Sequence, residues 1–496
     1  MAFQLAPEEL AGTAPVYQRI ARAIRAQVAS GALAAGDRLP TIRALAERLA
    51  VNRDTVASAY EVLAADGVVD AQVGRGTFVR GLRPRGRATP PVAPPLSANA
   101  ERLVGLDRAR VAYGAGRGAI PLHALVPDAN HYPLDAFRRS LSRALAEGGA
   151  PLFGYGDPQG YLGLREVLAE RLRTNGILIG PESLVLCQGA SQGIALALRL
   201  FADVDDAVAV EEPTYQNALA ALVALGLRAV PVPMTPAGAD LDALDRALAR
   251  PEVRVFYTIP TFHNPLGTST GLAHRTEVLA LAARHGKAVI EDAYEMDLRY
   301  AGRTVPSLAA LDDEGLVVQL QSFSKSLFPG VRAGALVARG RHVEALLALR
   351  HAADLGGSLP LQAALADFVR SGAYDRHLSA QRKRLRARRD ALLAALAAEM
   401  PEGASWTKPE GGFQVWLELP EPLDSREIHA DALRAGVLVA PGFQFHHDGR
   451  PSRGFRLSIA LADEDAIREG VGRLGRVVKE RLAVGASAPR RAPIPV

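Results

Sequence analysis

One lysine of the chain has neighbours that suit covalent chemistry. Only five lysines occur among the 496 residues, and four of them have ordinary explanations as loop, strand-edge or helix-surface residues. Lys325 differs, because LVVQLQSFSKSLFPGVRAG places it among hydroxyl residues directly after an apolar run, with Arg332 seven residues on. A desolvated amine beside hydroxyls and an arginine that bind phosphate is what a Schiff-base lysine requires. A lone SxSK is better explained as a surface loop, so the prediction depends on the other motifs.

Several of these motifs follow strand-like runs, in the order that such a site needs. GASQGIALAL comes after SLVLC and opens a helix, whose first N–H groups could bind a phosphate at the positive end of the helix dipole. Tyr215, in EEPTY, could stack on a pyridine ring. Each motif is weak alone. Together they are strong, since ligands of open α/β sheets bind beyond the carboxyl ends of the strands.

Two more motifs could supply polar partners for a substituted pyridine. Asn264, in the loop IPTFHNPLG, could donate a hydrogen bond to a phenolic oxygen, and Tyr294 could reach the same oxygen. Asp292 ends the run VIED, where its carboxylate would keep a pyridine nitrogen protonated and the ring an electron sink.

The elements that must position these residues extend from about residue 112 to 484. Apolar runs such as SLVLC, AVAV, VRVFYT and LVVQL alternate there with Ala- and Leu-rich helical stretches. Runs without polar alternation are typical of strands buried on both faces of a mostly parallel sheet. We expect a large subdomain over about residues 130–345, a smaller α+β subdomain over about 346–484, and a disordered tail at 485–496.

Residues 13–80 predict a second domain. Apolar positions recur every four residues from Val16 to Val28, Pro40 precedes a second helical stretch, and a third helix begins near Asn52. VVDAQVGRGTFV then predicts a hairpin around Gly-Arg-Gly. Three helices and a β-wing in this order are typical of a winged helix-turn-helix. Residues 81–111, which include RPRGRATPPVAPPLSAN, predict a stiff, extended linker.

The distribution of charge fits a DNA-binding domain at this end of the chain. The net charge is +5, and residues 13–80 hold nine arginines against six acidic residues. Residues 81–100 add three arginines and no acidic residue. An excess of positive charge confined to one module is the expected footprint of nucleic-acid binding.

The third helix should present its N-terminal residues to base edges in the major groove. We therefore predict DNA contacts from Arg43, Asn52, Arg53, Thr55 and, on the wing, Arg75. Arg53 could bind guanine O6 and N7 together, whereas Thr55 suits a phosphate. A second basic run, QRKRLRARRD at 381–390, is either a solvated helix face or an auxiliary DNA contact.

Composition excludes several other classes of protein. Hydrophobic residues make up 48% and charged residues 22% of the chain, as in folded proteins. No apolar run approaches the roughly 20 residues of a membrane-spanning helix, and the N-terminus lacks a signal pattern, so we expect a cytoplasmic protein without membrane contact. The single cysteine, Cys187, excludes an internal disulfide and a cysteine-cluster metal site, and we predict no metal.

These motifs together resemble a known family. Residues 112–484 resemble the fold-type I, aspartate-aminotransferase-like domains that bind pyridoxal 5'-phosphate (PLP), and residues 15–80 resemble the GntR winged helix. The combination is similar to the MocR subfamily of GntR regulators. The resemblance implies that Lys325 forms a Schiff base with PLP, Asp292 pairs with the ring nitrogen and Tyr215 stacks on the ring. It further implies the following contacts: Asn264 and Tyr294 with the phenolic oxygen; Ala190, Ser191, Gln192, Ser322, Ser324 and Arg332 with the phosphate; Tyr155 with the neighbouring subunit's phosphate; and Arg456 with an effector carboxylate.

The resemblance predicts a homodimeric transcriptional regulator that binds an operator with two half-sites in double-stranded DNA. Its PLP domain would sense PLP itself or an amino compound that forms an external aldimine with it. The alternative is a working aminotransferase, since HNPLG keeps the asparagine of true aminotransferases and the catalytic set is intact. The N-terminal domain favours the regulator, because a metabolic aminotransferase needs no winged helix. The phosphate loop departs from the family by having Ala-Ser-Gln-Gly where relatives more often carry two glutamines.

Overall fold

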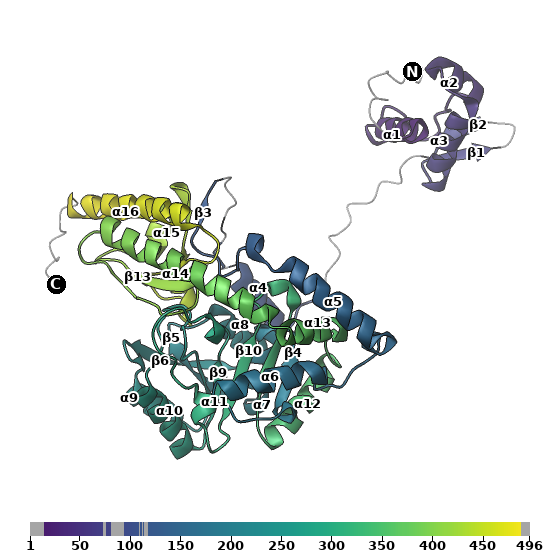
Figure 1. Cartoon of the computed structure of the whole chain (residues 1–496). Helices are drawn as coiled ribbons and strands as arrows, with labels where there is room; N and C mark the ends of the chain where they lie inside the picture. The colour runs from purple at the N-terminus through teal and green to yellow at the C-terminus, as the bar shows by residue number, and fades with distance from the viewer. Residues whose placement is uncertain are drawn as a thin grey trace. The chain divides into compact units, whose positions relative to one another are not determined.

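The computed structural model describes residues 14–72, 76–80, 94–108, 110–111, 113 and 118–487 (Figure 1). The chain divides into two compact units, Met1–Pro95 and Leu96–Val496. Arg75 of the predicted wing, residues 81–93 of the predicted linker and residues 488–496 of the predicted tail lie outside the described residues.

The N-terminal unit folds as three helices followed by a two-stranded sheet. Its elements are α1 (Val16–Ala29), α2 (Ile42–Leu49), α3 (Arg53–Ala65), β1 (Val69–Gln72) and β2 (Gly76–Val79). The two strands are antiparallel, with Val69 opposite Val79. Ile20, Ile24 and Val28 of the predicted four-residue repeat are buried in the core of this unit. The winged helix-turn-helix prediction is therefore confirmed.

Side-chain caps determine where the second and third helices begin. The Thr41 hydroxyl accepts from the N–H of Ala44 at 3.2 Å, and the Asn52 side chain accepts from the N–H of Asp54 at 3.2 Å. Such caps satisfy N–H groups that have no partner within the first turn of a helix. The cap at Asn52 makes Arg53 the first residue of α3.

An eight-stranded sheet forms the centre of the large unit. Its strand order is β4-β11-β10-β9-β8-β5-β6-β7. The strands are β4 (Leu184–Cys187), β5 (Ala207–Glu212), β6 (Arg228–Thr235), β7 (Gly238–Ala239), β8 (Val253–Thr258), β9 (Ala288–Asp292), β10 (Val317–Ser322) and β11 (Gly334–Val337). The five strands from β10 to β6 pair in parallel, whereas β11 is antiparallel to both of its neighbours. The carboxyl ends of the parallel strands therefore share one edge, as the sequence predicted.

Helices pack around this sheet, as Figure 1 shows. They are α5 (Leu134–Gly148), α6 (Leu162–Thr174), α7 (Ala190–Phe201), α8 (Gln216–Leu225), α9 (Leu241–Leu248), α10 (Leu272–His285), α11 (Leu308–Leu311), α12 (Arg341–Ala353) and α13 (Leu359–Arg370). Helix α12 packs on α7, and α13 packs on α5 and α6. Both helices thus lie with the large subdomain, whereas the boundary predicted near residue 346 falls within α12 and would assign α13 to the small one.

A smaller α+β subdomain follows. A four-stranded antiparallel sheet has the order β12-β13-β16-β15, and a separate two-stranded parallel sheet joins β14 to β3 from the start of the large unit. The strands are β3 (Ile120–Pro121), β12 (Ser405–Trp406), β13 (Gln414–Glu418), β14 (Val437–Leu438), β15 (Ala440–Pro441) and β16 (Gly454–Ser458), and the helices are α14 (Ala373–Glu399), α15 (Ser425–Arg434) and α16 (Glu464–Ser487). Helix α16 enters the region predicted as a disordered tail from 485.

The predicted linker contains one helix, α4 (Ala98–Arg108). The Ser97 hydroxyl accepts from the N–H of Ala100 at 3.1 Å and so caps its start. Helix α4 packs on α8, and the Asn99 side chain donates to the carbonyl of Ala224 at 2.7 Å. An entirely extended linker over 81–111 is therefore wrong, because the prolines end at Pro95 and a capped run of helix formers follows.

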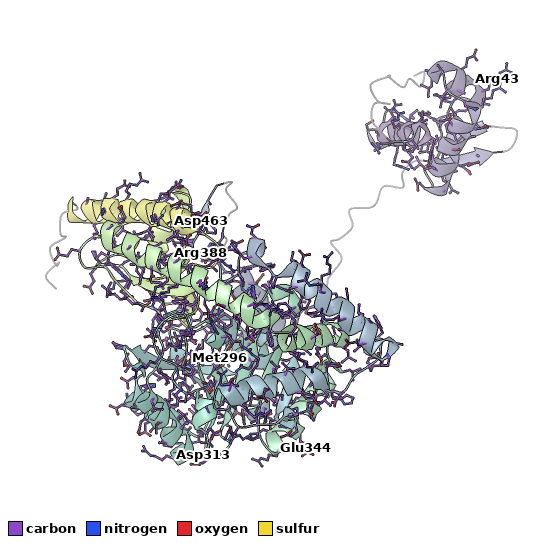
Figure 2. The ribbon with its side chains drawn as sticks, viewed as in Figure 1. Arg43, Met296, Asp313, Glu344, Arg388 and Asp463 are labelled. Atoms are coloured by element: carbon purple, nitrogen blue, oxygen red, sulfur yellow. The ribbon has the colours of Figure 1, made fainter. Side chains whose placement is uncertain are left out.

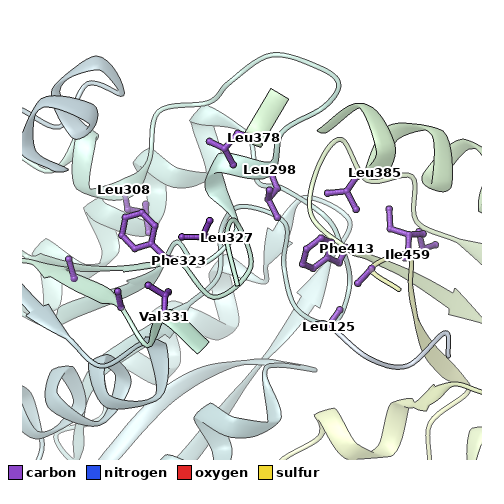
Figure 3. Packing of buried hydrophobic residues seen from close by; sticks show 14 of the residues in the cluster. Leu125, Leu298, Leu308, Phe323, Leu327, Val331, Leu378, Leu385, Phe413 and Ile459 are labelled. Carbon is purple, nitrogen blue, oxygen red and sulfur yellow. The ribbon is translucent and has the colours of Figure 1, made fainter. Parts of the chain in front are cut away.

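One apolar cluster crosses the boundary between the two subdomains. Figure 3 shows Phe323 and Leu327, which flank Lys325, together with Phe413 and Ile459 of the small subdomain, and all four are buried members of one core cluster. The residues before and after Lys325 in the sequence are consequently both fixed by packing in this core cluster. Among the described residues, none of the helices is long and apolar enough to cross a membrane.

Candidate functional site

Lys325 lies in the turn that follows β10, and its side chain is mostly withdrawn from solvent. The Lys325 ammonium donates a hydrogen bond to the backbone carbonyl of Leu125. Burial lowers the pKa of the Lys325 amine, and the positive charge of Arg456 lowers it further, while the carboxylate of Glu295 raises it. Burial therefore shifts Lys325 towards the neutral amine, which is the nucleophilic form.

Asp292 ends β9, the strand next to β10, and is 1% exposed. The Tyr257 hydroxyl donates to its Oδ2 at 2.7 Å. Within the described residues, its Oδ1 is buried and has no hydrogen-bond partner. Burial raises the pKa of Asp292 to about 6. A buried carboxylate oxygen without a donor is suited to a cationic N–H group supplied by a ligand.

Two further predicted residues, Tyr215 and Tyr294, lie near this carboxylate, and a third, Asn264, contacts Arg456. Tyr215 caps α8, and burial raises the pKa of its phenol, as does the negative charge of Asp292. The Tyr294 hydroxyl accepts from Gln414 Nε2 at 2.7 Å. The Oδ1 atom of Asn264 accepts from Arg456 Nη1 at 3.0 Å, which leaves the Asn264 amide N–H₂ as a donor.

The predicted phosphate loop lies between β4 and α7. Gly189, with φ of +86°, precedes the first helical residue, Ala190, and a Cβ built on it would lie 3.1 Å from the Arg332 guanidinium. Arg332 Nη2 donates to the Gln188 carbonyl at 2.7 Å. A glycine, a helix N-terminus and an arginine thus meet at one place, which is a suitable cradle for an anion.

The predicted phosphate ligands Ser322, Ser324 and Gln192 differ in the hydrogen bonds that they already make. The Ser322 hydroxyl accepts from the N–H of Ser324 at 3.3 Å, and the predicted contact of these serines with a phosphate stays a prediction. The Gln192 amide is engaged at both ends, since its oxygen accepts from Gln188 N at 2.7 Å and its nitrogen donates to Asp354 at 2.5 Å. Gln192 therefore orders the loop with its side chain, which leaves its backbone N–H and one amide N–H available to a phosphate.

Three successive backbone carbonyls, at residues 123–125, hold three side chains of the site. In chain order they accept from Arg456 Nη2 at 2.8 Å, from the Ser458 hydroxyl at 2.6 Å and from the Lys325 ammonium. Arg456 and Ser458 belong to β16, whereas Lys325 belongs to the large subdomain. This carbonyl segment (residues 123–125) therefore connects both subdomains to the chain that comes from the linker.

Arg456, the predicted carboxylate ligand, is 7% exposed. Its guanidinium lies over the Phe445 ring, 5.0 Å from the centroid, and its Nε has no hydrogen-bond partner among the described residues. Burial lowers its pKa. An incompletely paired, buried guanidinium is costly, and an effector carboxylate could supply the missing acceptor.

Tyr155, the predicted ligand of a neighbouring subunit's phosphate, is 92% exposed. Its contact with a second copy stays a prediction.

The predicted DNA contacts are located on the surface of the N-terminal unit. Arg43 is exposed on α2 (Figure 2), and Arg53 is exposed at the start of α3. Thr55 is half-buried, and the Asn52 side chain is occupied as a helix cap. Arg75 lies outside the described residues.

The basic run at 381–390 lies within α14 and is only partly solvated. Arg388 (Figure 2) is buried and donates to the Ala460 carbonyl at 2.7 Å. Arg389 donates to the Pro409 carbonyl at 2.8 Å, and Arg382 donates to the Asp297 carbonyl at 2.7 Å. These three arginines fasten α14 to its neighbours, so neither a solvated face nor a DNA contact describes them.

Comparisons with known proteins agree with this geometry. The family of aminotransferase classes I and II matches residues 125–474, and the gntR family of bacterial regulatory proteins matches residues 16–79. The uncharacterised HTH-type transcriptional regulator YdcR of Escherichia coli K12 is 32% identical over 94% of this chain and 99% of its own length. The probable rhizopine catabolism regulatory protein MocR of Rhizobium meliloti is 30% identical over 93% of both chains. The chain belongs to the MocR-type GntR regulators.

The large unit of this MocR-type regulator is also similar to enzymes of known structure. LysN, the α-aminoadipate aminotransferase of Thermus thermophilus, crystallised with N-(5'-phosphopyridoxyl)-L-leucine, is 31% identical with a TM-score of 0.69, over 78% of this chain and 96% of LysN. The family and this neighbour identify PLP as the cofactor. The residues present fit PLP, because the unpartnered Asp292 Oδ1 suits the ring nitrogen and the Gly189 loop with Arg332 suits the phosphate.

Two buried residues of the regulator's site escaped sequence reasoning. Tyr257 donates to Asp292, and Glu295 accepts from the Phe413 N–H and from Gln414. A signal existed for both, since Tyr257 carries a hydroxyl near the end of the strand VRVFYT and Glu295 follows Tyr294 directly. A phenol or carboxylate at a strand end is common, however, and only the fold shows what it faces.

Proposed function

We propose that this regulator changes its DNA binding when its PLP site changes state. The chain is a GntR-type regulator fused to an aminotransferase-like domain. The observation that carries the proposal is the carbonyl segment (residues 123–125), because it contacts Lys325 and Arg456 and continues, through α4, towards the DNA-binding unit.

The proposed chemistry is divided among a few side chains. Bound PLP supplies an aldehyde that reacts reversibly with primary amines and a ring that withdraws electrons. Lys325 would provide the resident amine, and Asp292 would accept the hydrogen bond of the ring nitrogen. Asn264 and Tyr294 would orient the ring through its phenolic oxygen. The α7 N-terminus and Arg332 would hold the phosphate.

The effector would act by exchanging partners at the carbonyl segment. An amino compound that takes the place of Lys325 frees the lysine amine to bind the Leu125 carbonyl. A carboxylate on the same compound would draw Arg456 from the carbonyl of His123. Because the ligand must prefer one conformation, a 100-fold preference would supply about 2.7 kcal/mol of coupling. Sensing of PLP alone would use the lysine contact and not the arginine contact.

The contacts next to the carbonyl segment support a path towards the linker. The Tyr113 ring stacks on His123 with centroids 4.0 Å apart, and its hydroxyl accepts from Gln444 at 3.3 Å. Helix α4, which precedes Tyr113, is docked on α8. A shift at residue 123 would therefore be passed to the segment that leads to the DNA-binding unit.

We also propose that the regulator works as a homodimer in the cytoplasm and reads two half-sites of an operator. Phe153, 73% exposed, lies beside the exposed Tyr155, and such apolar exposure suits an interface with a second copy. Two copies of α3 would read two half-sites, with Arg43, Arg53, Thr55 and Arg75 as contacts. The cytoplasm is proposed because the gntR family is bacterial and bacterial DNA lies in the cytoplasm.

The experiment that tests the function has two parts. Operators are selected from genomic fragments with the PLP-loaded full chain, and binding to them is measured by fluorescence anisotropy with and without PLP and with a panel of amines and amino acids. We expect at least a fivefold change in DNA affinity with one of these ligands, the lower end of ordinary allosteric coupling. Unchanged affinity across the panel contradicts the proposal.

The alternative is an aminotransferase, for which the complete residue set at the cofactor site is the favouring observation. Steady-state transamination is measured over pairs of amino acids and 2-oxo acids. A kcat in the ordinary range of about 1–1,000 per second for any pair would establish the enzyme instead.

A further inference from the structure

A cavity lies in the large unit where helix α4 is docked on α8 (Figure 1). Its volume is about 720 Å³, and its walls come from α4, α8 and the loop at residues 443–449 of the small subdomain. A volume of this size is ordinary for a ligand pocket. Among the described residues that line this space, which we call the α4 cavity, none is predicted to bind PLP, an effector carboxylate or DNA.

Much of the wall of the α4 cavity is apolar. Leu219, Leu222 and Val223 contribute to it from α8, and Leu106 contributes from α4. Leu106 is 37% exposed, so the protein alone does not bury it. A ligand with an apolar body would cover these side chains, which the hydrophobic effect favours.

The charged side chains of the cavity are mainly cationic. Arg110, just after α4, and Arg426, in α15, carry positive charges that do not titrate near neutral pH. Among the described residues of the lining, Asp448 is the one acid, and its carboxylate accepts from the Arg450 N–H at 3.1 Å. This balance of charge favours an anionic ligand.

Both arginines keep donors for such an anion. Arg426 Nη2 donates to the Gly449 carbonyl at 3.2 Å, and its guanidinium lies over the Phe443 ring, 4.4 Å from the centroid. A guanidinium has several N–H donors, so this anchored side chain keeps most of them for a ligand. Arg110 pairs with Asp107 at 3.4 Å on an exposed surface, and such a pair is weak enough to be exchanged for a ligand's anion.

The walls of the cavity are held in place without a ligand. Helix α4 is fastened by the Asn99 side chain, which donates to the Ala224 carbonyl at 2.7 Å. The loop from the small subdomain is fastened by the buried carboxylate of Glu212, which pairs with His447 and with Arg450. A site that is already formed loses less free energy on binding than one that the ligand must order.

We propose that the α4 cavity is a second ligand site, separate from the PLP site, and that it takes a small organic anion with an apolar body. The apolar body would cover Leu106 and the leucines of α8, and Arg110 and Arg426 would bind the carboxylate, sulfonate or phosphate group. Because α4 supplies part of the wall, an occupied site would hold α4 more firmly on α8, at the end of the predicted linker.

Two probes with the same aromatic body and different charge test this site. Naphthalene-2-sulfonate is anionic, whereas naphthalene-2-sulfonamide is uncharged at neutral pH, and neither forms a Schiff base with PLP. Binding to the PLP-loaded full chain is measured by calorimetry without DNA, so the result does not depend on the proposed function. We expect one sulfonate per chain, bound at least about tenfold more tightly than the sulfonamide, the factor that one hydrogen bond to a charged group provides. Equal affinities, or no binding of the sulfonate, overturn the proposal.

Matched double variants locate the bound anion. Arg110→Gln/Arg426→Gln removes both cationic groups and should weaken sulfonate binding at least about tenfold. Arg102→Gln/Arg434→Gln removes two exposed arginines of α4 and α15 that lie outside the lining, and it should bind the sulfonate as wild type does. No loss in the first variant, or an equal loss in both, overturns the proposal.

A third variant tests the apolar wall. Ala220 is a half-buried residue of the lining on α8, and Ala220→Phe would place a ring in the cavity. The affinity for the sulfonate should fall at least about tenfold, because the ring takes the space of the naphthyl body. Wild-type affinity in Ala220→Phe contradicts binding in this cavity. If circular dichroism shows that this variant is unfolded, the exposed arginine variants decide the question alone.

Discussion

At the scale of single residues, the site displaces two ionisable groups towards their neutral forms. Lys325 and Asp292 follow neighbouring parallel strands, in which Leu320 is paired with Asp292. Burial lowers the pKa of the amine and raises that of the carboxyl. A ligand that brings an aldehyde to the first and a cationic N–H to the second relieves both penalties. PLP has both groups, and this complementarity is the physical reason for its fit.

The first prediction concerns Lys325. The wild-type protein loaded with PLP should be yellow, and borohydride should fix the cofactor to Lys325. Lys325→Ala should lose the Schiff-base absorbance, because Lys325 is the one lysine of the sequence that follows β10 beside the predicted phosphate ligands. Lys287→Ala, at a surface lysine, is the control and should keep the absorbance. Retention of the band in Lys325→Ala would refute the assignment.

The second prediction uses the raised pKa of Asp292. The folded pKa is about 6 and the ordinary value is 3.8, so between these values the folded state binds more protons. Without cofactor, stability should fall as pH rises through this window, by at most about 3 kcal/mol. Asp292→Asn cannot ionise and can still accept from Tyr257.

The expected result for Asp292→Asn is a pair of opposite effects. At pH 7 the cofactor-free variant should melt at a higher temperature than wild type, and this advantage should be absent at pH 4. Its affinity for PLP should nevertheless fall, because the ring nitrogen loses its anionic partner. Thermal unfolding at both pH values and PLP titration measure these effects. Equal melting temperatures at pH 7 would show that burial does not penalise this carboxylate.

At the scale of elements, helix α3 is the predicted DNA-recognition helix, and its first turn is the part expected to contact bases. Its start is set by the Asn52 cap, which leaves Arg53 exposed in the first turn. Arg53→Ala should cost about 1–3 kcal/mol of operator affinity and relax specificity at one base pair. Arg22→Ala removes the same charge from the exposed surface of α1 and is the matched control. Both variants are measured on the selected operator and on single-base substitutions of it.

Two results would contradict this third prediction. A uniform loss of affinity across all operator variants would make Arg53 a phosphate contact. An equal loss in Arg22→Ala would show that only net charge matters.

The elements also show what the sequence can and cannot predict. The winged helix and the parallel strands were predictable, because hydrophobic periods of about four residues and unbroken apolar runs are imposed by local geometry. Helix α4 was missed, since five nearby prolines dominated the composition of its region. The hydrogen bonds to Glu295 from Phe413 and Gln414 were also missed, because they depend on how the start of β13 packs on the large subdomain.

At the scale of the whole molecule, assembly is the first question. Tyr155 is almost fully exposed, so we propose that its hydroxyl binds the phosphate in a second copy of the chain and not in its own. If a second copy receives it, Tyr155→Phe should lower PLP affinity about tenfold, roughly 1.4 kcal/mol for one hydrogen bond to a charged group, without changing the oligomeric state. Tyr161→Phe, a half-buried tyrosine nearby, is the control. Sedimentation and PLP titration provide the readouts. A monomer in sedimentation would contradict this fourth prediction.

The last prediction separates the two sensing models, and it depends on the position of Arg456 between the subdomains. The Arg456 guanidinium is divided between the Asn264 side chain and the His123 carbonyl. Arg456→Ala should therefore abolish the DNA-binding response to an amino acid effector, whose carboxylate has lost its partner, while PLP still binds. Arg453→Ala, which removes an arginine paired with Glu418 and Glu421, should respond as wild type.

The measurement is operator affinity against effector concentration, with PLP content determined in parallel. If PLP alone is the signal, Arg456→Ala should keep the full response, because Lys325 and the Leu125 carbonyl suffice for that state. A variant that loses PLP together with the response would place Arg456 in cofactor binding and exclude it from effector recognition. The same substitution thus distinguishes an amino acid sensor from a PLP sensor, because PLP has no carboxylate that Arg456 could bind.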